Sequence, residues 1–143
     1  MGRYDDALEL FGSGFNCAQS VLGSYVERQT DEGELALKLA AGFGGGMRMG
    51  EVCGAVTGAL MVIGLREGQY KAEDKAAKEK CSRLTRDFME EYAKRKGTLL
   101  CREILGYDVR DASAAQAHAA SKGQKCGEAI RLAIELLGEM GIE

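Results

Sequence analysis

The sequence predicts an all-α protein, a single compact bundle of about five to seven helices around a buried central helix. Three observations lead to this prediction. The 143 residues include no proline, apolar residues recur at helical spacing in alanine-rich and leucine-rich segments, and no segment shows the sustained apolar–polar alternation typical of a strand. A chain of this length suits one domain, so residues 1–143 are expected to form a single helical domain.

Four helices are expected in the first half of the chain, separated by glycine rather than proline. They run from about Tyr4 to Phe11, from the N-cap Asn16 to about Gln29, from Asp31 or Glu32 into a glycine-rich turn at residues 42–50, and from about Gly50 to Leu65. The fourth segment is apolar nearly all round, which is typical of a helix buried on every side. We therefore expect it at the centre of the bundle.

Within the central segment, Gly54 and Gly58 lie four residues apart on one face. Each glycine costs about 1 kcal/mol of helix propensity, which indicates a packing requirement such as the close approach of a neighbouring helix backbone. The same pair could instead serve a contact between two copies in a homodimer. Packing within one compact bundle is the simpler interpretation.

The second half of the chain predicts one long helix followed by shorter elements. These run from about Lys71 to Lys96, from Leu99 to Leu105 with Thr98 as N-cap, from Asp111 to Lys122, and from about Gln124 to Met140. The third of them is alanine-rich without large apolar residues, so it is expected to be a marginal surface helix or a loop. The first is charged on all but one stripe, and those charges are interpreted as a solvated face.

Composition excludes several classes of function. The chain has 19 basic and 22 acidic residues and a net charge of -3, which argues against a nucleic-acid-binding protein. Asp5 and Asp6 stand where a signal peptide would have a basic region and an apolar run. The apolar stretch from Val52 to Leu65 is shorter than the ~20 residues that cross a bilayer. We therefore expect a cytoplasmic protein that is not an integral membrane protein.

The five cysteines are the main indication of reactive chemistry in the sequence. Cys17, Cys53, Cys101 and Cys126 each fall in the first turn of a predicted helix. Free backbone N–H groups and the helix dipole stabilise negative charge there, which can lower the pKa of a thiol and make it a nucleophile or a metal ligand. Cys81 lies in the middle of a predicted helix on its apolar stripe, where core packing is the expected role.

Five segments of the chain together carry a family resemblance. They are Asn16-Cys17-Ala18-Gln19, the turn at residues 42–47, the run from Cys53 to Leu60, the run from Cys101 to Gly106, and Cys126. From Phe15 to about Leu137 the chain resembles the C_GCAxxG_C_C family of "putative redox-active" proteins. The resemblance implies a redox role for Cys17, Cys53, Cys101 and Cys126, has no counterpart for Cys81, and implies no defined substrate.

The first hypothesis for function is thiol–disulfide chemistry or electron transfer with an unknown redox partner, as in a thiol-disulfide oxidoreductase, which requires no cofactor. Cys53 is the expected attacking thiolate and Cys17 the expected resolving partner, although four cysteines allow three disulfide pairings. The adjacent turn could bind an anion or substrate through Gly44, Gly45, Gly46 and Arg48. Alternatively, these glycines only permit a tight connection between helices.

Two other functions remain open from the sequence. Cys17, Cys53, Cys101 and Cys126 could bind zinc or an iron–sulfur cluster, but their intervals of 36, 48 and 25 residues lack the short C-x-x-C spacing common in such sites. The single histidine, His118, is expected to be exposed rather than a ligand. The third possibility is a non-catalytic helical binding module whose methionines, including Met47 and Met49, line an interaction surface or a small-molecule pocket.

Overall fold

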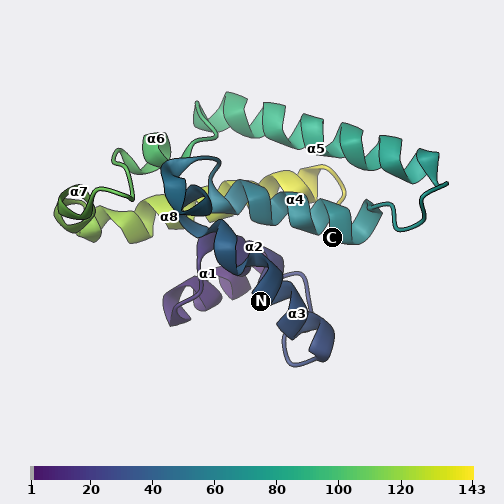
Figure 1. Ribbon diagram of the computed structural model, residues 1–143, viewed down its shortest axis with the longest axis horizontal. Coiled ribbons are helices and arrows are strands. Elements are labelled where there is room, and N and C mark those ends of the chain that lie inside the picture. The colour runs from purple at the N-terminus through teal and green to yellow at the C-terminus, as the bar shows by residue number, and fades with distance from the viewer. Residues whose placement is uncertain (1) are drawn as a thin grey trace.

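The computed structural model describes residues 2–143, which form eight α-helices and no strand apart from one isolated bridge. The helices are α1 (Arg3–Ser13), α2 (Cys17–Gly23), α3 (Asp31–Ala40), α4 (Gly54–Glu67), α5 (Lys75–Lys96), α6 (Cys101–Leu105), α7 (Ala112–Ala117) and α8 (Ala119–Glu139), with a short 3-10 helix at Ala41–Phe43 (Figure 1). The predicted all-α class is confirmed. The number of helices exceeds the five to seven expected, because several of them are only one or two turns long.

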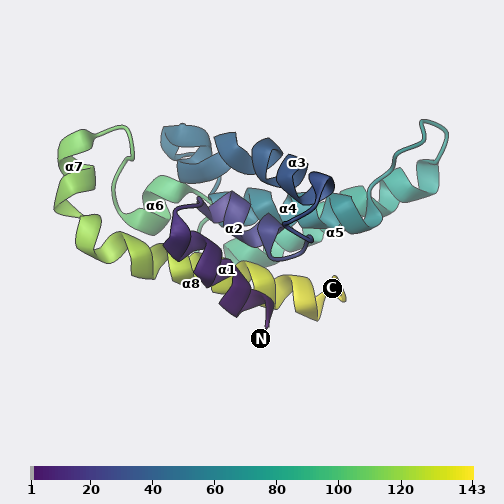
Figure 2. The ribbon, with the colours of Figure 1, turned by 90° about the horizontal axis from the view of Figure 1, so that it is seen from below.

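Helix α4 lies at the centre of the fold, as its sequence predicts. It contacts α2, α5 and α8, so apolar neighbours cover most of its circumference (Figure 1, Figure 2). Its fully buried side chains are Ala55, Val56, Ala59, Val62 and Ile63. A helix enclosed in this way needs apolar residues on every side, which explains why α4 shows no distinct polar face.

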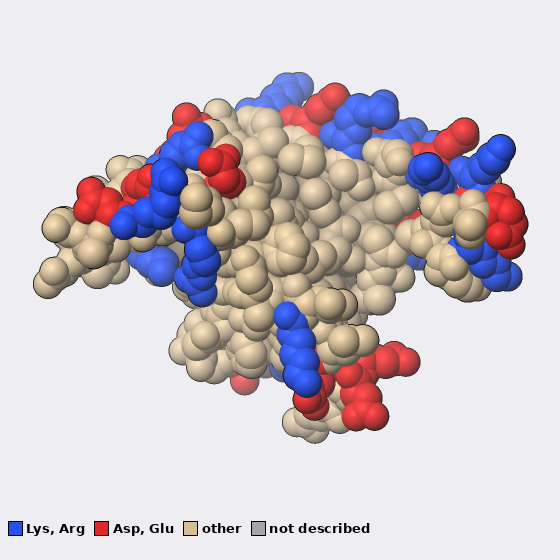
Figure 3. Space-filling model, viewed as in Figure 1, with Lys and Arg blue, Asp and Glu red and all other residues tan. Residues whose placement is uncertain are grey.

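Helices α5 and α8 complete the core. Phe88 and Tyr92 of α5 are fully buried, and the Tyr92 hydroxyl donates a hydrogen bond of 3.1 Å to the carbonyl of Ala129 in α8. The outer face of α5 carries interspersed acidic and basic side chains (Figure 3), as the sequence predicts. Cys81 of the same helix is half-buried and packs against the core, in line with its expected role.

Two of the three glycines of α4, Gly54 and Gly58, face α2. A Cβ atom at Gly58 would lie 2.7 Å from the carbonyl oxygen of Ala18, and one at Gly54 would lie 3.1 Å from the Ala18 nitrogen. The glycines therefore allow the backbones of two helices in the same chain to touch. This is the intramolecular packing expected from the sequence, and it leaves that face of α4 covered.

Helix α2 is shorter than predicted, because it ends at Gly23 rather than near Gln29. The Ser24 hydroxyl donates a hydrogen bond of 2.7 Å to the carbonyl of Val21, and the Arg28 guanidinium donates one of 3.3 Å to the carbonyl of Gly23. These side chains satisfy carbonyls that further helical turns would otherwise have used. The chain then turns and buries Tyr25.

Three helices begin later than predicted, among them α6, which begins at Cys101 rather than Leu99. Helix α4 begins at Gly54 rather than Gly50, because the preceding residues pair with the segment before α6 through a bridge between Val52 and Leu100. Helix α5 begins at Lys75 rather than Lys71, because the Asp74 carboxylate accepts a hydrogen bond from the Ala77 N–H and caps the helix there.

Three further predictions, all in the C-terminal part of the chain, are wrong. Thr98 does not cap α6, since Leu100 is its N-cap and donates its N–H to the Thr98 hydroxyl. Helix α8 begins at Ala119 rather than near Gln124, so Gly123 lies within the helix. Cys126 therefore lies inside the helix rather than in its first turn. His118 is half-buried rather than exposed, because its ring stacks on Tyr107 with centroids 5.0 Å apart.

Candidate functional site

The glycine-rich turn before α4 is a single left-handed turn. Gly45, Gly46, Met47 and Arg48 have φ values of 63°, 61°, 57° and 61°. Gly46 is required because a Cβ atom there would lie 2.5 Å from the backbone nitrogen of Glu51. Met47 and Arg48 adopt this conformation at a cost of about 1–2 kcal/mol each. The turn directs the following residues toward α6.

A short backbone pairing then positions two of the four cysteines. The Cys53 N–H donates to the carbonyl of Leu99 at 2.8 Å, and the Cys101 N–H donates to the carbonyl of Glu51 at 2.6 Å. Both cysteines lie one residue beyond the bridged pair, so their side chains share one face as diagonal neighbours. Cys53 and Cys101 are thus brought together although 48 residues separate them in the sequence.

Helix α2 positions Cys17 at its first residue. The Asn16 side chain accepts a hydrogen bond of 2.8 Å from the Gln19 N–H, and the Gln19 side chain accepts one of 3.1 Å from the Asn16 N–H. This capping box confirms Asn16 as the N-cap. Helix α2 also contacts α8, which carries Cys126.

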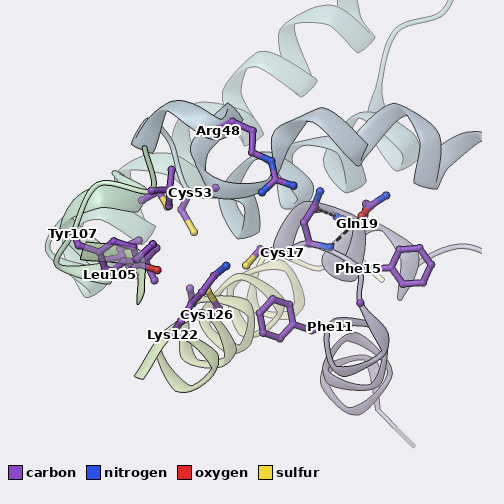
Figure 4. A pocket seen from close by; sticks show the side chains of 18 of the residues that line it. Phe11, Phe15, Cys17, Gln19, Arg48, Cys53, Leu105, Tyr107, Lys122 and Cys126 are labelled. Carbon is purple, nitrogen blue, oxygen red and sulfur yellow. Dashed lines mark hydrogen bonds between the residues drawn. The ribbon is translucent and has the colours of Figure 1, made fainter. Parts of the chain in front are cut away.

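All four cysteines of the resemblance line one cavity of about 390 Å³, to which Cys81 does not contribute. Cys17, Cys53, Cys101 and Cys126 come from α2, the start of α4, α6 and α8, and each is only 5–8% exposed. The labelled sulfurs of Cys17, Cys53 and Cys126 point toward the same space (Figure 4). All four thiols are free in this structure.

Cys17 of α2 and Cys126 of α8 interact across the cavity. The interaction between the two thiols raises the pKa of Cys17 well above its ordinary value and lowers the pKa of Cys126. The ammonium of Lys122, one helical turn before Cys126 on α8, lowers the pKa of Cys126 further, against the effect of burial. Cys126 is therefore the thiol best able to ionise.

The other two thiols do not show the activation that their helix starts predict. Burial raises the pKa of Cys53, although the N–H groups of Ala55 and Val56 at the start of α4 oppose that rise. Burial, together with the nearby Cys53 and Cys126, raises the pKa of Cys101 to about 12. Loss of water around the sulfur thus outweighs the helix N-terminus, because a buried anion lacks solvation.

Replacing Cys17 with alanine is expected to raise the pKa of Cys126, because the interaction with the Cys17 thiol that lowers this pKa is lost. The pH midpoint for alkylation of Cys126 by iodoacetamide, followed by peptide mass analysis, should move upward by about one unit or more. Cys17→Ser keeps a donor and should move the midpoint less. Equal midpoints for Cys17→Ala and the unmodified protein would contradict an interaction between the two thiols.

Part of the predicted anion site also lines the cavity. Gly45 and Arg48 do so, whereas Gly44 and Gly46 are packed against other parts of the chain. Lys122 was not predicted as a site residue, although its place four residues before Cys126 puts both side chains on one helix face. Phe11 and Tyr107 were not predicted either, because they reach the cavity from segments without a motif.

The arrangement of the thiols does not fit a single metal ion. Among residues 2–143, no three or more His, Cys, Asp or Glu side chains are grouped closely enough to hold one ion. The ligand set proposed for zinc, Cys17, Cys53, Cys101 and Cys126, is therefore gathered around the cavity without converging on one point.

Comparison with known proteins identifies the family to which this chain belongs. Over the part of the chain that the structure describes, no helix is both long enough and apolar enough to span a membrane. No curated protein and no solved structure gives a significant match. The model of the family described as "Putative redox-active protein (C_GCAxxG_C_C)" matches residues 15–140, and this match includes all four cysteines of the cavity. The chain therefore belongs to the C_GCAxxG_C_C family.

Proposed function

We propose that this protein carries out reversible thiol–disulfide exchange, with Cys126 as the attacking thiolate and Cys17 as the resolving thiol. The observation that carries the proposal is the convergence of these two thiols on one cavity, into which both sulfurs point (Figure 4). A thiolate is the reactive form of cysteine, and a second thiol within reach converts a mixed disulfide into an internal one.

The reaction balances without a cofactor. The Cys126 thiolate attacks one sulfur of a disulfide, forming a mixed disulfide and releasing the other half as a thiolate. Cys17 then loses its proton to the solvent and attacks the Cys126 sulfur, which forms the Cys17–Cys126 disulfide and releases the second half. The substrate disulfide gains two electrons and two protons in all, and the protein dithiol loses them.

This proposal differs from the sequence-based expectation for Cys53. Burial raises the pKa of Cys53, whereas the pair of Cys17 and Cys126 favours one thiolate. We propose that Cys53 and Cys101 form a second dithiol, which exchanges with the first by the same two steps across the shared cavity. We place this chemistry in the cytoplasm, where cysteines remain reduced between turnovers.

Oxidation of the reduced protein tests the proposal. Protein purified without oxygen and treated with one equivalent of a small disulfide should lose two hydrogens, and peptide mapping should place the link between Cys17 and Cys126. A first link at Cys81 would contradict the proposal. Native mass spectra of the anaerobic protein test the alternative, because extra mass that departs on acidification would support a zinc or iron–sulfur site.

Loss of the cavity thiols separates exchange from a non-catalytic binding module. A module that only binds a partner should keep that binding when Cys17 and Cys126 are both serine, with no more than a packing defect. The exchange proposal requires that this double variant no longer forms a disulfide with the small oxidant. The matched control is Cys81→Ser, which leaves the cavity intact.

A further inference from the structure

Two basic side chains at the cavity have no acidic partner among residues 2–143. Asn16 and Gln19 also line it, but their amides are engaged, since Asn16 donates to the carbonyl of Ala41 at 3.0 Å and Gln19 to that of Leu37 at 3.1 Å. Arg48 and Lys122 line the cavity as well, and the ion pairs among residues 2–143 all involve other side chains. They are the cationic groups that a ligand could engage.

These two cations approach the sulfurs from different elements. Arg48 reaches toward the cavity from the glycine-rich turn, and Lys122 reaches in from α8 on the other side (Figure 4). The sulfurs of Cys17, Cys53 and Cys126 point into the space between those two elements. Arg48 and Lys122 are themselves exposed, so they stand at the mouth of the cavity while the sulfurs are recessed.

The charges around the cavity favour an anion. None of the residues that line it is acidic. The nearby Asp108 is paired with Arg110 at 2.6 Å, which holds the pKa of Asp108 at about 2. An anionic disulfide that approaches an anionic thiolate is normally repelled, and two unpaired cations at the entrance offset that repulsion.

The volume of the cavity limits the size of the disulfide that can bind in it. A cavity of about 390 Å³ falls within the range of roughly 300–1,000 Å³ that small ligands occupy. With the four thiols only 5–8% exposed, a disulfide fixed on the surface of a folded protein reaches them less easily than a small molecule does.

We infer that the cavity selects a low-molecular-weight disulfide that carries a carboxylate on each half, with Arg48 and Lys122 each binding one carboxylate. This inference rests on the exchange reaction proposed above and adds its substrate class. Cys126 attacks one sulfur, one carboxylated thiolate leaves, and attack by Cys17 releases the other. Two molecules of carboxylated thiol are formed for each Cys17–Cys126 disulfide.

Three small disulfides that carry their polar group on the same two-methylene arm test charge selection. They are 3,3'-dithiodipropionate with two negative charges, bis(2-hydroxyethyl) disulfide with none, and cystamine with two positive charges. The second-order rate of oxidation of the reduced protein, followed by mass, should be roughly tenfold higher for the dianion than for the neutral compound, and lowest for the dication. The difference should shrink in 0.5 M salt, since the cations lie at the surface.

Substitutions of Arg48 and Lys122 test whether these two cations cause the preference for the dianion. Arg48→Gln and Lys122→Gln should each lower the ratio of the dianion rate to the neutral rate by roughly threefold. The ratio is the readout because Lys122→Gln also makes Cys126 a poorer thiolate and slows all three reactions. Arg83→Gln removes an exposed arginine of α5 that does not line the cavity, and should leave the ratio unchanged.

The possible results separate this inference from the exchange reaction on which it rests. Equal rates for the three disulfides, or an equal change of the ratio in Arg83→Gln, would overturn charge selection and leave exchange standing. No reaction with any of the three would overturn both. A ratio that falls only in the two cavity variants supports the carboxylated disulfide as the substrate class.

Discussion

Replacing Cys126 with serine is expected to lower the rate of disulfide reduction by about a hundredfold or more, because serine cannot supply a thiolate. Cys126 is the cavity thiol whose pKa is lowered, and Cys17 and Lys122 stabilise its charge. The measurement is the second-order rate at which the reduced protein consumes bis(2-hydroxyethyl) disulfide. This neutral probe avoids any effect of charge selection.

The Cys17→Ser variant should behave differently from Cys126→Ser. It keeps the attacking thiolate and a hydroxyl donor, but it lacks the resolving sulfur, so a mixed disulfide between Cys126 and half of the probe should accumulate. Intact mass shows the adduct, and peptide mapping locates it. An adduct on Cys53 would instead restore the role that the sequence suggested for that residue.

The matched control for both variants is Cys81→Ser. Cys81 is half-buried on α5 and does not line the cavity. Its replacement should leave the reaction rate within about twofold, since substitutions away from the site change little. A large loss of rate in Cys81→Ser would show that the assay reports stability rather than chemistry at the cavity.

Gly58→Ala is expected to lower the free energy of unfolding by about 2 kcal/mol or more. The added methyl group would lie 2.7 Å from the carbonyl oxygen and 3.0 Å from the Cα of Ala18, so the α2 backbone must move. Overpacking of this kind costs about 1–3 kcal/mol, and contact with rigid backbone puts it at the upper end. That cost outweighs the gain of about 1 kcal/mol in helix propensity.

Gly64→Ala is the control within the same helix. A Cβ atom at Gly64 meets nothing within 4 Å, so this variant should be stabilised by up to about 1 kcal/mol through helix propensity alone. Urea unfolding followed by circular dichroism measures both variants. Equal free energies for Gly58→Ala and Gly64→Ala would contradict the close approach of α2 and α4.

The Gly58→Ala variant should also affect the site, because the helix that it displaces carries Cys17. Ala18, which the new methyl group would displace, follows Cys17 directly in α2. A shift of α2 moves the Cys17 thiol relative to Cys126, so formation of the internal disulfide should slow more in Gly58→Ala than in Gly64→Ala. Rates of disulfide formation measured well below the unfolding midpoint distinguish this effect from loss of folded protein.

Local patterns in the sequence determined the helical class, the buried central helix and the Asn16 cap. These features depend on residues within one or two helical turns, where spacing and side-chain chemistry act directly. The same reasoning was wrong for the helix boundaries near Gln29 and Gly50. Those boundaries depend on the Arg28 side chain and on pairing with residues 99–101, which only the folded chain brings into place.

The sequence by itself also singled out Cys17, Cys53, Cys101 and Cys126 as a set, through their positions and the family resemblance. The ranking that we propose for these cysteines depends on their tertiary surroundings. Cys126 lies within α8 beside Cys17 and Lys122, whereas burial raises the pKa of Cys53 despite its place at the start of α4. The ionisation of a thiol depends on its solvation and on charges brought from distant segments, and local sequence does not contain that information.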